Sequence, residues 1–191
     1  MTQGDTDVND QQASGHSGSP RVRDLGLAFV TPQLKRILEV WEAKRGVRIA
    51  PCRDDFGLRD LSFALPNIAV LSVVRDGARV RFLVRMMGSQ LDAYVAPMTG
   101  KFVDEMVPAE FAEKWASLWG GAVETRRAQR SVGRVKFGGK HYYVAESLFA
   151  PLATDGELPD GVLVATYFHL AQSDQPEQSA ISRSLLSEIQ A

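Results

Sequence analysis

The sequence has one cysteine, three histidines and almost no net charge, and each scarcity excludes a class of protein. Cys52 alone can form neither an intramolecular disulfide nor a thiolate cluster for zinc or iron–sulfur. A lone cysteine also suits a reducing, cytoplasmic setting. The 22 basic and 23 acidic residues leave a formal charge of -1, whereas a dedicated nucleic-acid-binding domain is clearly basic. We therefore expect no nucleic-acid partner.

Long apolar runs and catalytic motifs are missing as well. The longest strongly apolar stretches, around residues 68–74 and 162–168, are far shorter than the roughly 20 residues of a membrane helix. The amino terminus lacks the basic start and apolar segment of a signal peptide. No nucleophile elbow, phosphate-binding loop or HExxH motif occurs, and Asp55 and Glu146 are isolated carboxylates. We expect no membrane contact, no metal site and no enzyme, and rank a small enzyme a distant third among possible functions.

The length of 191 residues indicates one domain with tails. Residues 1–23 are mostly small and polar and cannot repay the entropy cost of ordering, which predicts a disordered tail. The domain then spans residues 24–170. Residues 171–191 form a polar C-terminal tail in which Ile181, Leu185 and Ile189 repeat every four residues. That spacing predicts a short terminal helix, marginal in isolation.

Two helices are expected to lead the domain. Thr31 followed by Pro32 is a typical helix start, and Gly46 is a typical end. Between them four apolar residues recur at helical spacing: Leu34, Ile37, Leu38 and Trp41. Asp55 is expected to cap a second, shorter helix that ends at Pro66.

Strands are expected to follow. Asp76–Gly77 is the strongest hairpin signal, and it joins the strands predicted over 67–74 and 78–87. A helix is then expected to begin at Pro108 and to end at Gly120–Gly121. Three further strands are expected after it: one that ends near residue 137, one over 140–152 and one over 162–169. Gly138–Gly139 is expected to turn the chain between the first two of these. This order predicts an α+β domain with one antiparallel sheet.

The order of elements and two segments resemble the PAS family. The segment RFLVRMMGSQL (residues 81–91), followed by MTGK at 98–101, is similar to a second PAS strand and the helical segment after it. ESLFAPLATDG (residues 146–156) is similar to a fourth strand and its turn. The YVAP segment at 94–97 departs from the family, which would place a glycine-containing turn there. The resemblance covers residues 31–169 and implies a PAS fold: a five-stranded antiparallel sheet with helices on one face, here with an additional N-terminal helix.

The resemblance implies a sensory or interaction module, sometimes with a small molecule held between the sheet and its helices. We expect no kinase, cyclase or DNA-binding output domain outside residues 31–169. The leading prediction is therefore a cytoplasmic, stand-alone signalling protein that acts on an unidentified protein partner.

One strand face and the helix after Pro108 would line the pocket of such a module. The candidate residues are Val80, Phe82, Val84, Met86, Phe111 and Trp115. The same side chains equally suit a filled core, and no particular cofactor is indicated. His141 and His169 could each offer an imidazole to haem, although a strand histidine without neighbouring ligands is more often a surface or core residue. Cys52 precedes the first predicted strand, away from the helical segment where a flavin would attach.

Arg126, Arg127 and Arg130 form an RRxxR cluster similar to the phosphate-binding arginines of PilZ domains. The alternative function is therefore a cyclic-dinucleotide effector, although the second PilZ element is missing and a solvated charged segment is the plainer interpretation. Glu146 is expected to pair with a strand arginine such as Arg85.

The leading helix must bury its apolar face, either on its own sheet or across a two-fold axis against a second copy. We expect a homodimer that forms through Leu34, Ile37, Leu38 and Trp41.

Overall fold

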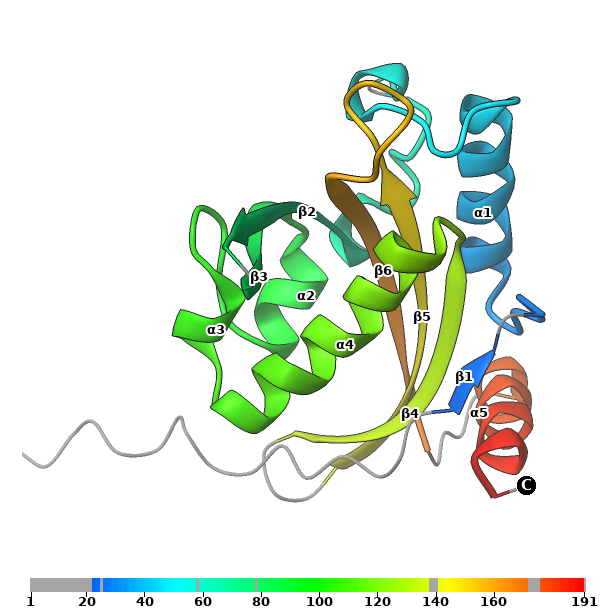
Figure 1. Cartoon of the computed structure of the whole chain (residues 1–191). Coiled ribbons are helices and arrows are strands. Elements are labelled where there is room, and N and C mark those ends of the chain that lie inside the picture. The colour runs from blue at the N-terminus through cyan, green and yellow to red at the C-terminus, as the bar shows by residue number, and fades with distance from the viewer. Residues whose placement is uncertain are drawn as a thin grey trace, which may run out of the picture.

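A computed structural model describes residues 22–24, 26–57, 59–77, 79–137, 141–171 and 176–190. The strands are β1 (Val22–Asp24), β2 (Ile68–Asp76), β3 (Arg79–Met87), β4 (Gln129–Phe137), β5 (His141–Leu152) and β6 (Gly161–Leu170). The helices are α1 (Pro32–Arg45), α2 (Ser89–Tyr94), α3 (Val103–Met106), α4 (Ala109–Thr125) and α5 (Pro176–Gln190), with 3-10 turns η1 (Arg53–Asp55) and η2 (Leu65–Asn67) (Figure 1). Most of the tail predicted over residues 1–23 and the predicted Gly138–Gly139 turn lie outside the described residues.

The five predicted strands form one antiparallel sheet in the order β4-β5-β6-β2-β3. The predicted hairpin is confirmed, because Asp76 pairs with Arg79 and Gly77 takes the positive φ of 57° that the tight turn requires. The short β1 adds a sixth strand by pairing with β4, with Val22 opposite Val132. The polar composition of the amino terminus gave no sign of this edge strand.

Helices cover both faces of the sheet. The helices α2, α3 and α4 lie on one face, as the sequence predicts, and α1 and α5 lie on the other (Figure 1). Every residue from Gly161 to Ala165 of β6 is buried. Because a strand that is covered on both faces buries every side chain, its sequence is a continuous apolar run rather than an alternation of polar and apolar residues, and β6 has this pattern.

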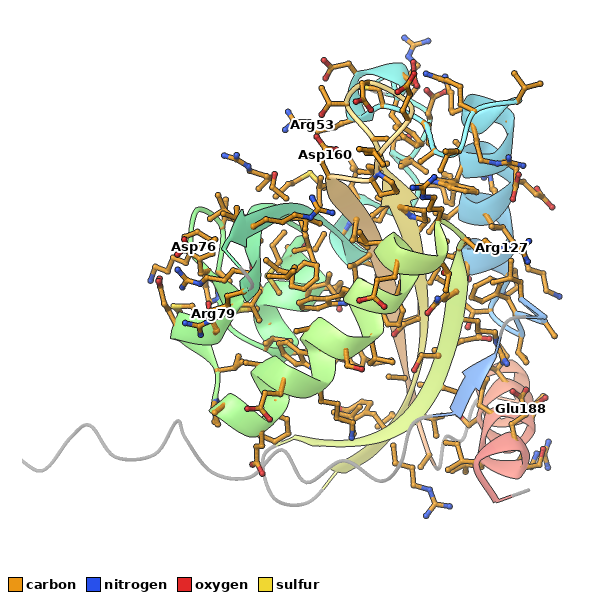
Figure 2. All side chains as sticks on the ribbon, in the orientation of Figure 1. Arg53, Asp76, Arg79, Arg127, Asp160 and Glu188 are labelled. Carbon is orange, nitrogen blue, oxygen red and sulfur yellow. The ribbon has the colours of Figure 1, made fainter. Side chains whose placement is uncertain are left out.

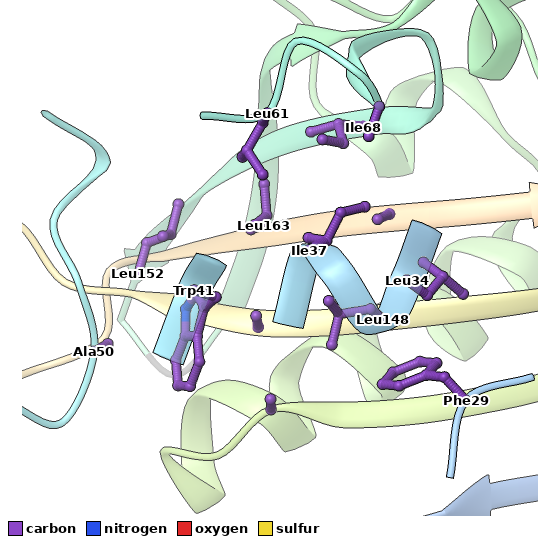
Figure 3. Close-up of a cluster of buried hydrophobic side chains, with 14 of the residues drawn as sticks. Phe29, Leu34, Ile37, Trp41, Ala50, Leu61, Ile68, Leu148, Leu152 and Leu163 are labelled. Atoms are coloured by element: carbon purple, nitrogen blue, oxygen red, sulfur yellow. The ribbon is translucent and has the colours of Figure 1, made fainter. Parts of the chain in front are cut away.

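The leading helix α1 packs its apolar stripe onto the sheet of its own chain. It begins after Thr31 with Pro32 in its first turn and ends at Gly46, as predicted. Leu34, Ile37 and Trp41 are at most 2% exposed and pack in one cluster with residues of β5 and β6, including Leu148 and Leu163 (Figure 3).

The expected dimer surface on α1 is therefore corrected. Three of its four residues are core, and Leu38 is partly buried against the same cluster. The Trp41 indole also donates a hydrogen bond to the Pro151 carbonyl at 2.9 Å. Dimerisation itself stays a prediction, but it would need another surface.

Two helix predictions are wrong. Residues 55–57 and 59–66 form turns, bends and 3-10 geometry instead of an α-helix. The Asp55 carboxylate accepts the Cys52 N–H at 2.7 Å at the single turn η1, and it also accepts a hydrogen bond from Arg48 at 2.7 Å. The helix α4 continues past Gly120–Gly121 to Thr125 and ends where Arg126 adopts a left-handed conformation. Each glycine costs a helix about 1 kcal/mol relative to alanine, and the burial of Ala122 and Val123 offsets that cost.

The C-terminal segment forms the helix predicted from its four-residue repeat, and it is part of the core. Leu185 is fully buried and clusters with Val132 of β4 and Val144 of β5. The Ser182 hydroxyl donates to the Leu170 carbonyl at 2.6 Å, which ties α5 to the end of β6. Within the described residues, no helix has the length and apolarity needed to cross a membrane.

Candidate ligand cavity and the buried ion network

A cavity of about 100 Å³ lies between the sheet and the helices α2, α3 and α4. Its sheet wall includes Leu71, Val84, Phe149 and Val164, and its helix wall includes Leu91, Val103, Trp115 and Trp119. The lining is mainly apolar, which is the character of small-molecule sites in proteins.

Three of the six predicted pocket residues line this cavity: Val84, Phe111 and Trp115. Phe82 lies on the same side but packs edge-to-face on Trp119, with ring centroids 5.3 Å apart. It borders a second hollow between β3, α3 and α4. Val80 is 47% exposed near the turn and also borders that second hollow.

The sixth predicted residue, Met86, lies on the opposite face of the sheet, where it packs against the α1 cluster. A β-bulge causes this correction. Leu71 pairs with Val84 and Val70 pairs with Met86, so Arg85 is an extra residue on β3. Side chains that follow this extra residue therefore point to the opposite face of the sheet from the one that strict alternation predicts. Met87 lines the cavity in place of Met86.

Hydroxyl groups contribute to the polar part of the cavity wall, beside Lys114 and Arg134, and sequence reasoning missed them. Ser147 of β5 and Thr166 of β6 are directly opposite in the sheet, both line the cavity, and their hydroxyl oxygens are 2.9 Å apart. Ser131 of β4 is paired with Ser147 in register, is 1% exposed, and its hydroxyl has no hydrogen-bond partner among the described residues. The adjacent polar residues Glu146 and Ser147 interrupt an otherwise apolar strand, but nothing in the sequence shows which of them faces the cavity.

Aromatic rings gather at one end of the cavity. Phe168 lines the cavity, and the Tyr94 ring of α2 packs on it with centroids 4.3 Å apart. Tyr94 also meets Tyr143 edge-on at 5.5 Å. Burial, with a contribution from Tyr143, raises the pKa of Tyr94. Tyr94 belongs to the YVAP segment that departs from the PAS pattern, so the departure supplies an aromatic contact beside the cavity.

A buried ion network lies on the other face of the sheet. The Arg130 Nε donates to Glu146 at 2.6 Å, and its two terminal nitrogens donate to Glu188 of α5 at 2.6 and 3.1 Å. The Glu146 carboxylate also accepts the N–H groups of Val30 and Thr31 at 2.9 and 2.7 Å, where the chain enters α1. One arginine thus connects β4, β5 and both terminal helices.

The network corrects two predictions. Arg130 is 1% exposed and paired with two carboxylates, while Arg126 and Arg127 are exposed, so the three arginines do not form one phosphate-binding surface. Figure 2 shows Arg127 at the surface near the start of β4 and Glu188 on α5. The partner of Glu146 is Arg130 rather than Arg85, whose Nε instead donates to the Ser72 hydroxyl at 2.8 Å.

His169 is a core residue. Its Nε2 lies 2.9 Å from the Thr31 hydroxyl, and its side chain is buried beside the ion network. Burial lowers the pKa of His169, and the neighbouring Glu146 carboxylate opposes that shift. In the part of the chain that the structure describes, no three His, Cys, Asp or Glu residues gather as a metal site would need, and the side chain of His141 lies outside that part.

A comparison with protein-family models agrees with this architecture. A family model described as "PAS fold" matches residues 69–167, just over half of the chain. A solved structure of a variant of RsLOV is similar at a TM-score of 0.40 and 12% identity, covering 85% of each chain. No curated protein matches the sequence.

Proposed function

Because the chain belongs to the PAS-fold family, we propose that it is a signalling protein that senses a small molecule in the cavity and responds through protein contacts. The observation that carries the proposal is the cavity itself, which lies between the sheet and α2–α4 and has an apolar lining with a local pair of hydroxyl groups. A concave apolar site with few polar groups is the usual form of a ligand site.

The alternative functions have less support. A cyclic-dinucleotide site would have to rely on Arg126 and Arg127, because Arg130 is buried and paired with Glu146 and Glu188. A small enzyme would need a reactive pair of groups, and the polar groups of the cavity wall that the structure describes include no carboxylate.

Native mass spectrometry of the full chain, purified without added ligand, tests the sensing proposal. The wild type should retain a compound that Val84→Phe, which fills the cavity wall, excludes. Val80→Phe is the matched control, since the same substitution on the same strand lies outside this cavity. If no compound is retained, and no member of a metabolite library stabilises wild type more than Val84→Phe, ligand sensing is contradicted.

The response is proposed to pass to a protein partner in the cytoplasm, and a second copy of the chain is the first partner to test. Light scattering at micromolar concentration should show a dimer. Since Leu34, Ile37 and Trp41 are core residues, the dimer should assemble through other surface residues. A monomer across that concentration range would contradict self-association.

A further inference from the structure

We infer that the cavity takes a compact, uncharged molecule that has an apolar body and one hydrogen-bonding group, and that flavin- or haem-sized groups do not fit it. The inference rests on the proposed function, because it names the ligand class of the same cavity. Its three supports are the volume, the charge and the hydroxyl pair of the site.

The volume sets the size of the ligand. Pockets for drug-sized molecules measure about 300–1,000 Å³, whereas this cavity measures about 100 Å³. A dry apolar cavity of about 150 Å³ binds benzene or xenon. The cavity therefore suits a molecule no larger than a single small ring.

The charge of the lining favours a neutral ligand. The cavity wall, as far as the structure describes it, includes two cationic residues, Lys114 and Arg134, and no acidic residue. Arg130 meets α5 and Val132 packs there, so strand alternation places the Arg134 side chain on the α5 face as well. Lys114 is partly exposed and already interacts within the protein. A cationic ligand would thus lose its hydration without an acidic partner. An anionic ligand would have to recruit the Arg134 guanidinium, whose Nε is buried without a hydrogen-bond partner among the described residues, away from the α5 side of the strand.

The hydroxyl pair provides the polar contact. In the Ser147–Thr166 hydrogen bond one hydroxyl donates to the other, and the accepting hydroxyl keeps its own O–H for a third group. The neighbouring Ser131 hydroxyl is buried and has no partner among the residues that the structure describes, so this part of the β4–β5–β6 surface has unused hydrogen-bonding capacity. One hydroxyl or carbonyl on the ligand would use it.

The tryptophans make the test direct, because their indole N–H signals can be followed by ¹⁵N NMR on the full chain. Trp115 and Trp119 line the cavity, whereas Trp41 lies on the other face and donates to Pro151. Benzene, phenol, benzoate and flavin mononucleotide serve as probes. Benzene and phenol should shift the Trp115 and Trp119 signals while that of Trp41 stays in place. Phenol should bind about two- to tenfold more tightly than benzene, which corresponds to the net contribution of one neutral hydrogen bond.

Variants separate the parts of the inference. Ser147→Ala should retain benzene binding and lose the preference for phenol, and Ser72→Ala, a serine on the opposite face, should leave that preference unchanged. Val84→Phe should abolish the binding of both probes, and Val80→Phe should not. Ala69→Val, a smaller substitution in the same wall, replaces Val84→Phe if that variant does not fold.

The outcomes distinguish this inference from the proposed function. Preferred binding of benzoate or flavin mononucleotide at Trp115 and Trp119 would overturn the ligand class and leave ligand sensing intact. A phenol preference that survives Ser147→Ala would overturn the role of the hydroxyl pair. If no probe shifts either signal, the ligand class is contradicted, whereas the cavity as a sensing site is decided separately by the native mass spectrometry and the metabolite library.

Discussion

The two faces of the central sheet are built in different ways. On the face of α1 and α5, aliphatic side chains pack together with the rings of Phe29 and Trp41, and the Arg130 network joins both terminal helices to β4 and β5. On the face of α4, large rings such as Trp115, Trp119 and Phe149 meet the sheet and leave a cavity. The two faces of one sheet therefore differ in structure: one face holds the terminal segments in place, and the other contains the cavity.

The largest expected effect comes from removing the centre of the ion network. Arg130→Ala leaves the buried Glu146 without its cationic partner and should reduce the free energy of unfolding by about 3–5 kcal/mol. Urea denaturation measures this change. Arg127→Ala, an exposed arginine on the same segment, should change stability by less than about 0.5 kcal/mol. Equal effects of the two substitutions would contradict a stabilising network.

A second substitution acts on the cavity face. A Cβ atom at Gly88, between β3 and α2, would lie 2.1 Å from the Leu65 carbonyl oxygen. Gly88→Ala should therefore displace α2 and destabilise the protein by about 1–3 kcal/mol. Gly120→Ala is the control with the opposite sign: nothing lies within 4 Å of the added methyl group, and alanine should stabilise α4 by about 0.5–1 kcal/mol. Thermal unfolding compares them, and an unaffected Gly88→Ala protein would refute this packing.

The smallest effect is a pH dependence on the α1 and α5 face. Burial lowers the pKa of His169 below its ordinary 6.5, so the unfolded chain binds this proton more readily than the folded one. Stability should be complete above pH 6.5 and decline as the pH falls toward the folded-state pKa. His169→Gln should reduce the difference between unfolding free energies measured at about pH 7.5 and about pH 5.5.

Asp55 and Asp104, whose pKa values are lowered by hydrogen bonds, titrate below 3.8 and do not contribute in this window. A His169→Gln protein with the full wild-type pH dependence would show that the proton binds elsewhere.

Features of the sequence that depend on neighbouring residues were predictable. The Asp76–Gly77 turn and the alternation of the strands beside it gave the hairpin, and Thr31–Pro32 with Gly46 gave the ends of α1. The order of the elements along the chain, together with the two PAS-like segments, predicted the PAS family, which the family match confirms. In each case the deciding physics lies within a few residues of the chain.

Features that depend on distant partners were not predictable from the same patterns. Arg130 reads as a solvated residue because its partner Glu188 lies 58 positions away. Met86 was placed on the wrong face because a bulge at Arg85 depends on the pairing with β2. The hydroxyl pair of Ser147 and Thr166 exists only once β5 and β6 are aligned in register.

The difference between the two faces is tested most directly by a crystal structure of the full chain under xenon pressure, because xenon enters dry apolar cavities. The account predicts one xenon site on the α4 face, in contact with Val84, Trp115 and Phe149, and none between α1 and the sheet. Xenon on the α1 face, or an α4 face closed to xenon, would contradict it.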